Sequence, residues 1–163
     1  MQLEGSCHCG AVHFTVASHT PYPYMQCYCS ICRKTAGAGG YTINIMGDAK
    51  TLKVEGQENL KIYRARVPVP GEPGKTTVSP AHRHFCGTCG SFLWIADADW
   101  PQWVYPFATA IDTALPTPPE REHIMLNHAA PWVHIPEGET EHSFREFPEL
   151  SIEDWHKTRG LYD

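Results

Sequence analysis

The sequence predicts a mainly β fold, and two features of the chain lead to that prediction. Short stretches in which apolar and polar residues alternate recur along most of the 163 residues, which is the pattern of half-buried strands. Helical periodicity is nearly absent until the C-terminal end, and 14 prolines separate the alternating stretches and favour turns. This length suits one folding unit with a sizeable core, so we expect a single domain over residues 1–163.

Two predicted strands come early in the chain. In residues 11–16 (AVHFTV), Val12, Phe14 and Val16 alternate with Ala, His and Thr. In residues 41–46 (YTINIM), apolar side chains stand at the odd positions and alternate with Thr, Asn and Met. Both stretches are therefore expected to form strands with one face towards the core.

The next two predicted strands, residues 51–56 (TLKVEG) and 60–65 (LKIYRA), lie close together in the sequence. Each places two apolar side chains on one face, with polar residues between them. The residues that connect them are rich in turn formers. We therefore expect the two strands to pair as a hairpin.

The middle of the chain carries two aromatic-rich stretches, residues 91–97 (SFLWIAD) and 102–111 (QWVYPFATAI), which also predict strands. Pro106 has no backbone N–H to donate, so we expect the second of these strands to lie at a sheet edge or to contain a bulge. Residues 66–75 and 114–123 are rich in proline and are expected to form long loops within the domain.

The C-terminal residues predict one short helix. Ser151 stands before IEDWHKTR (152–159) in the position of an N-cap, and Asp154 occupies the third position of a capping box. Gly160 is placed to end the helix.

Composition and charge argue against several classes of partner. Thirteen Lys and Arg against 18 Asp and Glu give a formal net charge of −5, so a nucleic-acid backbone is not an expected partner. The N-terminal residues do not resemble a signal peptide, and no stretch approaches the roughly 18 apolar residues of a membrane span. We therefore expect a cytoplasmic protein with no membrane partner, and the sequence makes no prediction of its oligomeric state.

The seven cysteines are the most informative feature of the sequence. They are an odd number in a chain without a recognisable signal peptide, which disfavours a disulfide framework. All of them fall in three short motifs, C-x-C, C-x-C-x-x-C and C-x-x-C, and such clustering is typical of metal ligands. The positions are Cys7, Cys9, Cys27, Cys29, Cys32, Cys86 and Cys89.

Seven thiols divide into four and three, because a closed structural zinc takes four ligands and a three-ligand site keeps one position open. Spacing alone allows two divisions. In the first, the four-ligand site consists of Cys7, Cys9, Cys86 and Cys89. In the second, a stretched zinc ribbon, it consists of Cys29, Cys32, Cys86 and Cys89.

Three segments, in their order and spacing, resemble the glutathione-dependent formaldehyde-activating enzyme family, which also includes centromere protein V. They are residues 5–16 (GSCHCGAVHFTV), 27–39 (CYCSICRKTAGAG) and 85–94 (FCGTCGSFLW). The later ATAIDT (108–113) and HIMLNHAAPW (123–132) are similar to the end of the family pattern. The resemblance implies a β-tent fold, in which small antiparallel sheets meet around zinc.

The resemblance also implies two zinc ions per chain and assigns their ligands. Cys7, Cys9, Cys86 and Cys89 would hold a structural zinc. Cys27, Cys29 and Cys32 would hold a catalytic zinc with an open fourth position. Arg33 and Lys34 follow the triplet directly and are candidates to bind the substrate. The family often has His where Tyr28 stands and a second Arg where Lys34 stands.

The activity that the resemblance implies is that of a carbon–sulfur lyase of the S-(hydroxymethyl)glutathione synthase type. Such an enzyme joins glutathione, or a similar thiol, to formaldehyde or another small aldehyde. The nucleophile is the thiolate, and a free thiol with a pKa of about 8.5 is mostly protonated at neutral pH. A thiol bound to zinc is deprotonated, so an open three-thiolate site fits this chemistry.

Three other interpretations of the triplet remain open from the sequence. A histidine such as His8, His82 or His84 would complete a purely structural site. The triplet would otherwise be a labile site that is empty in the isolated protein. The chain as a whole would, as an alternative to an enzyme, be a zinc-stabilised binding module without catalysis. The C-x-C-x-x-C motif is also similar to loops that hold iron–sulfur clusters, although the usual fourth cysteine with its own spacing is missing.

Overall fold

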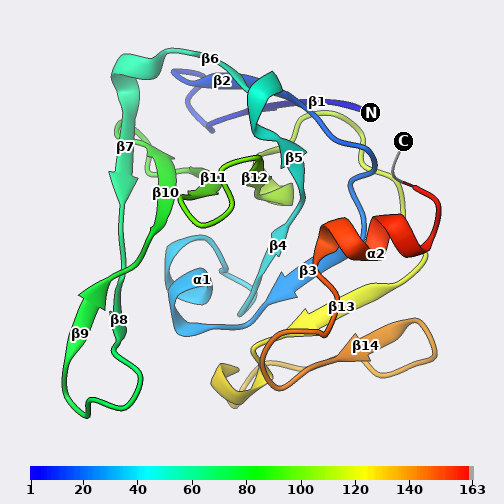
Figure 1. Cartoon of the computed structure of the whole chain (residues 1–163). Helices are drawn as coiled ribbons and strands as arrows, with labels where there is room; N and C mark the ends of the chain where they lie inside the picture. The colour runs from blue at the N-terminus through cyan, green and yellow to red at the C-terminus, as the bar shows by residue number, and fades with distance from the viewer. Residues whose placement is uncertain (162–163) are drawn as a thin grey trace.

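The structure, a computed structural model, describes residues 1–161 and confirms a mainly β fold (Figure 1). One sheet has the strand order β1 (Gln2–Ser6), β2 (His13–Ala17), β6 (Lys53–Glu55). A second has the order β5 (Gly47–Asp48), β12 (Trp103–Pro106), β11 (Phe92–Asp97), β10 (Ala81–Cys86), β7 (Leu60–Tyr63). A third has the order β14 (Glu141–Ser143), β13 (Arg121–Ile124), β3 (Tyr24–Cys27), β4 (Thr42–Asn44), and the last pair is β8 (Arg66–Pro68) with β9 (Thr76–Val78).

Helices are short and connect these sheets. The α-helices are α1 (Ser30–Thr35) and α2 (Ile152–Thr158). The 3-10 helices are η1 (Ala49–Thr51), η2 (Gln57–Asn59), η3 (Ala108–Ala110) and η4 (Leu126–His128). Figure 1 shows α1 near the middle of the molecule, between the five-stranded and four-stranded sheets. The described residues include no helix long and apolar enough to cross a membrane.

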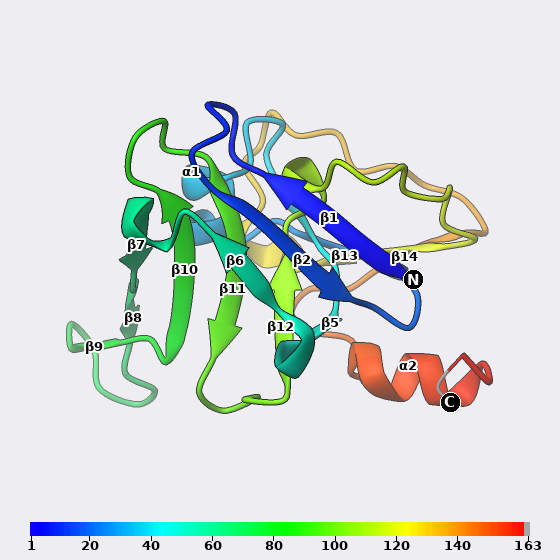
Figure 2. The ribbon, with the colours of Figure 1, turned by 90° about the horizontal axis from the view of Figure 1, so that it is seen from above.

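The main core lies between the three-stranded and the five-stranded sheets. Seen from above, β1, β2 and β6 run obliquely across β10, β11 and β12 (Figure 2). Phe14 of β2 and Trp94 of β11 meet there with ring centroids 5.1 Å apart. The predicted strand at residues 11–16 is confirmed, because Val12, Phe14 and Val16 are all buried in this core.

The predicted strand over residues 41–46 is confirmed only for residues 42–44, which form β4. The inward side chain of this short strand is Thr42, which is 3% exposed, and not one of the apolar side chains that flank it. Ile45 and Met46 are both buried as the chain turns into β5. The alternation therefore identified a strand but assigned its faces incorrectly.

The predicted hairpin of residues 51–56 and 60–65 is wrong, although both stretches contain strands. β6 pairs with β2 in one sheet, and β7 pairs with β10 in another. Between them the chain turns through η2, which Gly56 enters with φ of +74°. A Cβ at Gly56 would lie 1.9 Å from the carbonyl oxygen of Ala11, so only glycine allows this close crossing between the two sheets.

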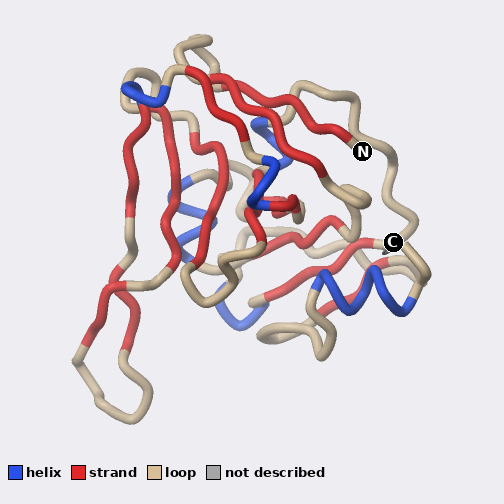
Figure 3. The backbone as a smooth tube through the Cα atoms, turned by 45° about the horizontal axis from the view of Figure 1, so that its top comes forward, coloured by secondary structure: helices blue, strands red, loops and turns tan. Residues whose placement is uncertain are grey.

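The strands around the predicted loops also differ from expectation. Residues 66–75 do not form a loop alone, because β8 occupies their start and pairs with β9 as an arm that projects from the body of the molecule (Figure 3). Of residues 114–123, the last three belong to β13. β13 runs parallel to both β3 and β14, so the implied arrangement of antiparallel sheets holds for the other pairs but not for these.

Pro106 was expected at an edge or a bulge, but β12 lies inside its sheet, between β5 and β11. Pro106 is the last residue of β12, and the pairing with β5 involves only Trp103 and Val104. Its carbonyl accepts a hydrogen bond of 2.9 Å from the N–H of Ile45, and no donor is required of its own nitrogen.

The C-terminal helix is confirmed as α2. The hydroxyl of Ser151 accepts the N–H of Asp154 at 3.0 Å, and it donates to the Asp154 carboxylate at 2.7 Å. Ile152 and Trp155 are buried, which fastens the helix to the body of the protein. Gly160 follows the helix with φ of +62°.

Candidate functional site

Four thiols meet where two tight turns approach each other. Cys7 and Cys9 lie between β1 and β2, whereas Cys86 ends β10 and Cys89 lies in the turn to β11. Their four Sγ atoms all lie within 4.8 Å of one another. Cys7 and Cys86 are buried, and the other two are exposed. The first of the two divisions that spacing allowed is therefore the one that the fold produces, and the stretched zinc ribbon is wrong.

The distances in this group fit a tetrahedral metal. The Sγ atoms of Cys7 and Cys9 are 3.6 Å apart, and those of Cys9 and Cys86 are 3.8 Å apart. Zinc bound tetrahedrally by thiolates at about 2.3 Å separates its sulfur atoms by about 3.8 Å. The N–H of Val12 donates to the Cys7 sulfur at 3.3 Å, as expected for a sulfur that carries negative charge. The four-cysteine group can therefore hold a metal ion and is compatible with zinc.

The other three thiols form a second group at the start of α1. Cys27 ends β3, Cys29 is the N-cap of α1, and Cys32 lies in its first turn. Their Sγ atoms also lie within 4.8 Å of one another. No histidine of the described residues joins either group, so a site completed by His8, His82 or His84 is not observed.

The three thiols of the triplet differ in their surroundings. Cys27 and Cys32 are buried, whereas Cys29 is partly exposed and is the thiol that a ligand can reach. The thiols of Cys27 and Cys32 donate towards Cys29, which lowers the pKa of Cys29 to about 2. The same contact with Cys29 raises the pKa of Cys27. The N–H of Cys32 also donates to the Cys29 sulfur, at 3.3 Å, so this helix start favours negative charge on Cys29.

Tyr28, between two of these cysteines, anchors the triplet to the four-stranded sheet. Its side chain is fully buried, and its hydroxyl lies 2.9 Å from Nδ1 of His123 on β13. Nε2 of His123 lies 2.7 Å from the carboxylate of Glu141 on β14, which also accepts a hydrogen bond of 3.0 Å from Arg121. The bond to His123 is the main cause that lowers the pKa of Glu141. The backbone is held as well, because the N–H of Tyr28 donates to the carbonyl of Ile124 at 3.0 Å.

Sequence reasoning did not find this network. It treated Tyr28 only as a position where the family often has His. The partners lie about a hundred positions further along the chain and come together only because β13 pairs in parallel with β3 on one side and with β14 on the other. No local motif around residues 121–124 signals that pairing.

Comparison with known proteins identifies the family. The family described as "Glutathione-dependent formaldehyde-activating enzyme" matches residues 2–127. The chain belongs to this family. It is 54% identical over 161 residues to a protein of Halomonas elongata named "Putative glutathione-dependent formaldehyde-activating enzyme", covering 99% of this chain and 98% of that one. A crystal structure of a Rhodobacter sphaeroides protein is similar with a TM-score of 0.52 at 25% identity, covering 72% of this chain and 98% of that one.

In this family member, Arg33 and Lys34 line a cavity of about 670 Å³ between α1 and the four-cysteine group. His8, Ser91 and Asp112 contribute polar atoms to its wall. Nε of Arg33 is buried and has no hydrogen-bond partner. The triplet cysteines are not among the lining residues, so the two cations predicted to bind substrate face the space beside the triplet and not the sulfur atoms themselves.

A second cavity, of about 370 Å³, lies on the other side and was not expected from the sequence. It is mostly apolar, and its wall includes Met25, Ile124 and Tyr105. These three side chains belong to or pack against the same apolar cluster as Cys27 and Cys32. The triplet therefore shares its apolar cluster with the wall of one cavity, and the residues that follow it on α1 line the other, whose wall is part polar and part apolar.

Proposed function

We propose that this protein is a zinc-dependent carbon–sulfur lyase of the S-(hydroxymethyl)glutathione synthase type. It adds the sulfur of glutathione, or of a similar thiol, to the carbon of formaldehyde or another small aldehyde. The S–H proton is lost and the aldehyde oxygen gains one, so the product is an S-hydroxymethyl thiol. The observation that carries the proposal is the division of seven thiols into a group of four and an open group of three.

The two groups are assigned different roles. Cys7, Cys9, Cys86 and Cys89 hold a structural zinc that fastens the β1–β2 turn to the β10–β11 turn. Cys27, Cys29 and Cys32 hold the catalytic zinc. When bound there, zinc supplies a site at which a thiol is deprotonated at neutral pH, because it stabilises the thiolate.

The chain's own residues bind and orient the substrate. Three thiolates and one zinc carry a net charge of −1 (+2 − 3), which repels an incoming thiolate. Arg33 and Lys34, one turn further along α1, offset this charge and attract the carboxylates of glutathione. Tyr28 holds the turn that carries Cys27 and Cys29 in one position, so that the thiol and the aldehyde meet in a fixed geometry. We place the protein in the cytoplasm, where thiols stay reduced.

Two variants test the proposal. Cys29→Ala should remove the acceleration of S-hydroxymethylglutathione formation, measured by exchange NMR with glutathione and formaldehyde, and should leave the circular dichroism spectrum unchanged. Cys86→Ala should unfold the protein, because a structural zinc contributes directly to folding stability.

Two results would contradict the assigned roles. Equal unfolding by Cys29→Ala and Cys86→Ala would remove the distinction between a catalytic and a structural site. A folded wild-type protein with two zincs that never accelerates the reaction would favour the non-catalytic, zinc-stabilised binding module.

A further inference from the structure

Arg83 on β10 is a buried cation without an ion-pair partner among the described residues. Its side chain is only 6% exposed, and its Nε and Nη1 atoms are fully buried without a hydrogen-bond partner. None of the ion pairs among the described residues involves Arg83. Burying a guanidinium in this way is strongly unfavourable unless an acceptor completes it. An anion from outside the chain would complete it.

The position of Arg83 relates it to the apolar cavity beside the triplet. In the five-stranded sheet, Arg83 lies opposite Ile95 on β11, and Ile95 lies opposite Tyr105 on β12. Residues directly opposite each other in antiparallel strands point to the same face, with Cβ atoms about 4.5–5.5 Å apart. Ile95 and Tyr105 both line the cavity of about 370 Å³. The Arg83 side chain is therefore the next one along this row: it lies beside the wall that Ile95 and Tyr105 form, and it is not itself a lining residue.

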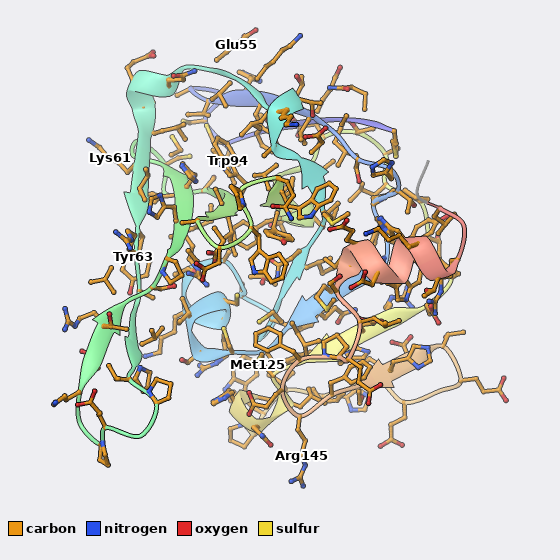
Figure 4. The ribbon with its side chains drawn as sticks, viewed as in Figure 1. Glu55, Lys61, Tyr63, Trp94, Met125 and Arg145 are labelled. Atoms are coloured by element: carbon orange, nitrogen blue, oxygen red, sulfur yellow. The ribbon has the colours of Figure 1, made fainter. Side chains whose placement is uncertain are left out.

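The opposite end of the row is the edge strand β7, where Tyr63 lies opposite Arg83. Tyr63 lies on the outer side of the molecule in Figure 4 and is 43% exposed. Arg83 thus lies between an exposed edge and the cavity. An anion bound to it would lie near the surface, with the rest of the ligand directed towards the triplet, because Tyr105 packs against the cluster that contains Cys27 and Cys32.

The cavity defines the kind of anion. None of its lining residues among the described ones is Lys, Arg or His, so Arg83 would be the single cation beside it. One guanidinium matches one carboxylate in charge, and its planar fork matches a carboxylate in shape. A phosphate dianion would remain half neutralised. We propose that Arg83 binds a carboxylate of the thiol substrate in this cavity; the inference rests on the proposed function, in which that thiol is glutathione or a similar molecule.

The experiment compares two probes that share the peptide and the thiol and differ in the charge of their carboxylates, which the diester replaces by neutral ethyl esters. Glutathione and its diethyl ester, in which both carboxylates are esterified, are titrated by calorimetry into the zinc-loaded protein. Wild type should bind glutathione at least about 10-fold more tightly than the diester. Arg83→Met, which keeps the length of the side chain and removes the charge, should lose most of that preference, with Arg33 and Lys34 accounting for what remains, and should bind the diester as wild type does. Arg83→Lys, which keeps the charge without the fork, should bind glutathione with intermediate affinity.

Arg66→Met is the matched control. It removes the same charge from the exposed β8–β9 arm, where Arg66 donates to the hydroxyl of Thr76 at 2.9 Å, and it should bind glutathione as wild type does. If Arg83→Met also bound glutathione as wild type does, the inference would be wrong and the proposed function would stand. If wild type bound no glutathione at all, the proposed function would fail, and the assignment of Arg83 would fail with it.

A second measurement separates binding from a structural role. In the absence of glutathione, Arg83→Met should have a melting temperature equal to or above that of wild type, because residues 1–161 offer Nε and Nη1 of Arg83 no partner to lose. A lower melting temperature together with loss of zinc would show that the guanidinium pairs within the protein, and would overturn the proposal.

Discussion

Replacing Tyr28 by Phe removes one oxygen atom from the network that anchors the triplet. The Glu141 carboxylate can only accept, so Nε2 of His123 donates in that bond; the Tyr28 hydroxyl lies 2.9 Å from Nδ1 of His123 and donates to Oε1 of Gln26 at 3.3 Å. Phe fills nearly the same volume as Tyr. The substitution therefore leaves the packing in place and removes the hydroxyl alone.

The magnitude follows from the burial of the group that is left behind. His123 is 0% exposed and Gln26 is 5% exposed, so water cannot replace the missing hydroxyl at either partner. A buried polar group without its partner costs about 1–3 kcal/mol of folding stability. For a chain of this size, that loss lowers the melting temperature by roughly 2–12 °C, at about 2–4 °C for each kcal/mol.

The assay is thermal unfolding of the zinc-loaded protein, followed by zinc release to a chromophoric chelator at a fixed temperature. Tyr28→Phe should lower the melting temperature by the stated amount. It should also release the triplet metal faster than wild type does, because Cys27 and Cys29 flank the loosened residue. The four-cysteine metal, held elsewhere, serves as the internal reference and should be released at the wild-type rate.

Tyr41→Phe is the matched control. Its ring lies 5.0 Å from that of Tyr28, but its hydroxyl makes none of the hydrogen bonds found among the described residues. This variant should unfold and release metal as wild type does. Equal behaviour of Tyr28→Phe and Tyr41→Phe would refute the reasoning, since the network would then contribute nothing to the site.

Three further predictions concern the fold around the site. His156 is buried and donates to the carbonyl of Tyr22 at 2.7 Å, and burial lowers the pKa of its imidazole. The free energy of unfolding should therefore fall as the pH drops below about 6.5, the pKa of histidine in the unfolded chain. In chemical denaturation, His156→Gln should show a weaker dependence of that free energy on pH in the same range. Gly56→Ala should lose more than 1 kcal/mol of stability in urea unfolding, because the added Cβ brings both backbone strain and a clash. Gly71 has nearly the same φ but open space around it, so Gly71→Ala brings the backbone strain alone and should lose less. Ser151→Ala should cost about 0.5–2 kcal/mol by the same assay, and an unchanged midpoint would show that the cap contributes nothing.

The parts of the fold that sequence reasoning predicted correctly are those decided by neighbouring residues. The alternation around Phe14 identified β2, and the Ser151 cap identified α2, because in both cases the signal lies within a few positions of the chain. The hairpin of residues 51–56 and 60–65 failed for a long-range reason. Two strands close in sequence pair with different partners when a residue such as Gly56 lets the chain cross between sheets.

The same distinction applies to the site. The cysteine motifs identified all seven candidate ligands, but their spacing allowed two divisions. A family resemblance and then the approach of the β1–β2 and β10–β11 turns selected one. The network of Tyr28 with His123 depends on the parallel pairing of β3 with β13, which no sequence motif predicts. Arg83 was missed because an arginine within a strand carries no signal until the absence of its partner is visible in three dimensions.

The central claim is that the triplet is an open metal site, and zinc X-ray absorption during a glutathione titration tests it most directly. Elemental analysis should first find two zincs per chain. Before glutathione is added, the two zincs together should have seven sulfur ligands, all from the cysteines of the chain. Glutathione should add an eighth sulfur ligand in wild type but should add none in Cys29→Ala. Two zincs whose sulfur coordination does not change with glutathione, or one zinc per chain with three free thiols, would contradict the account.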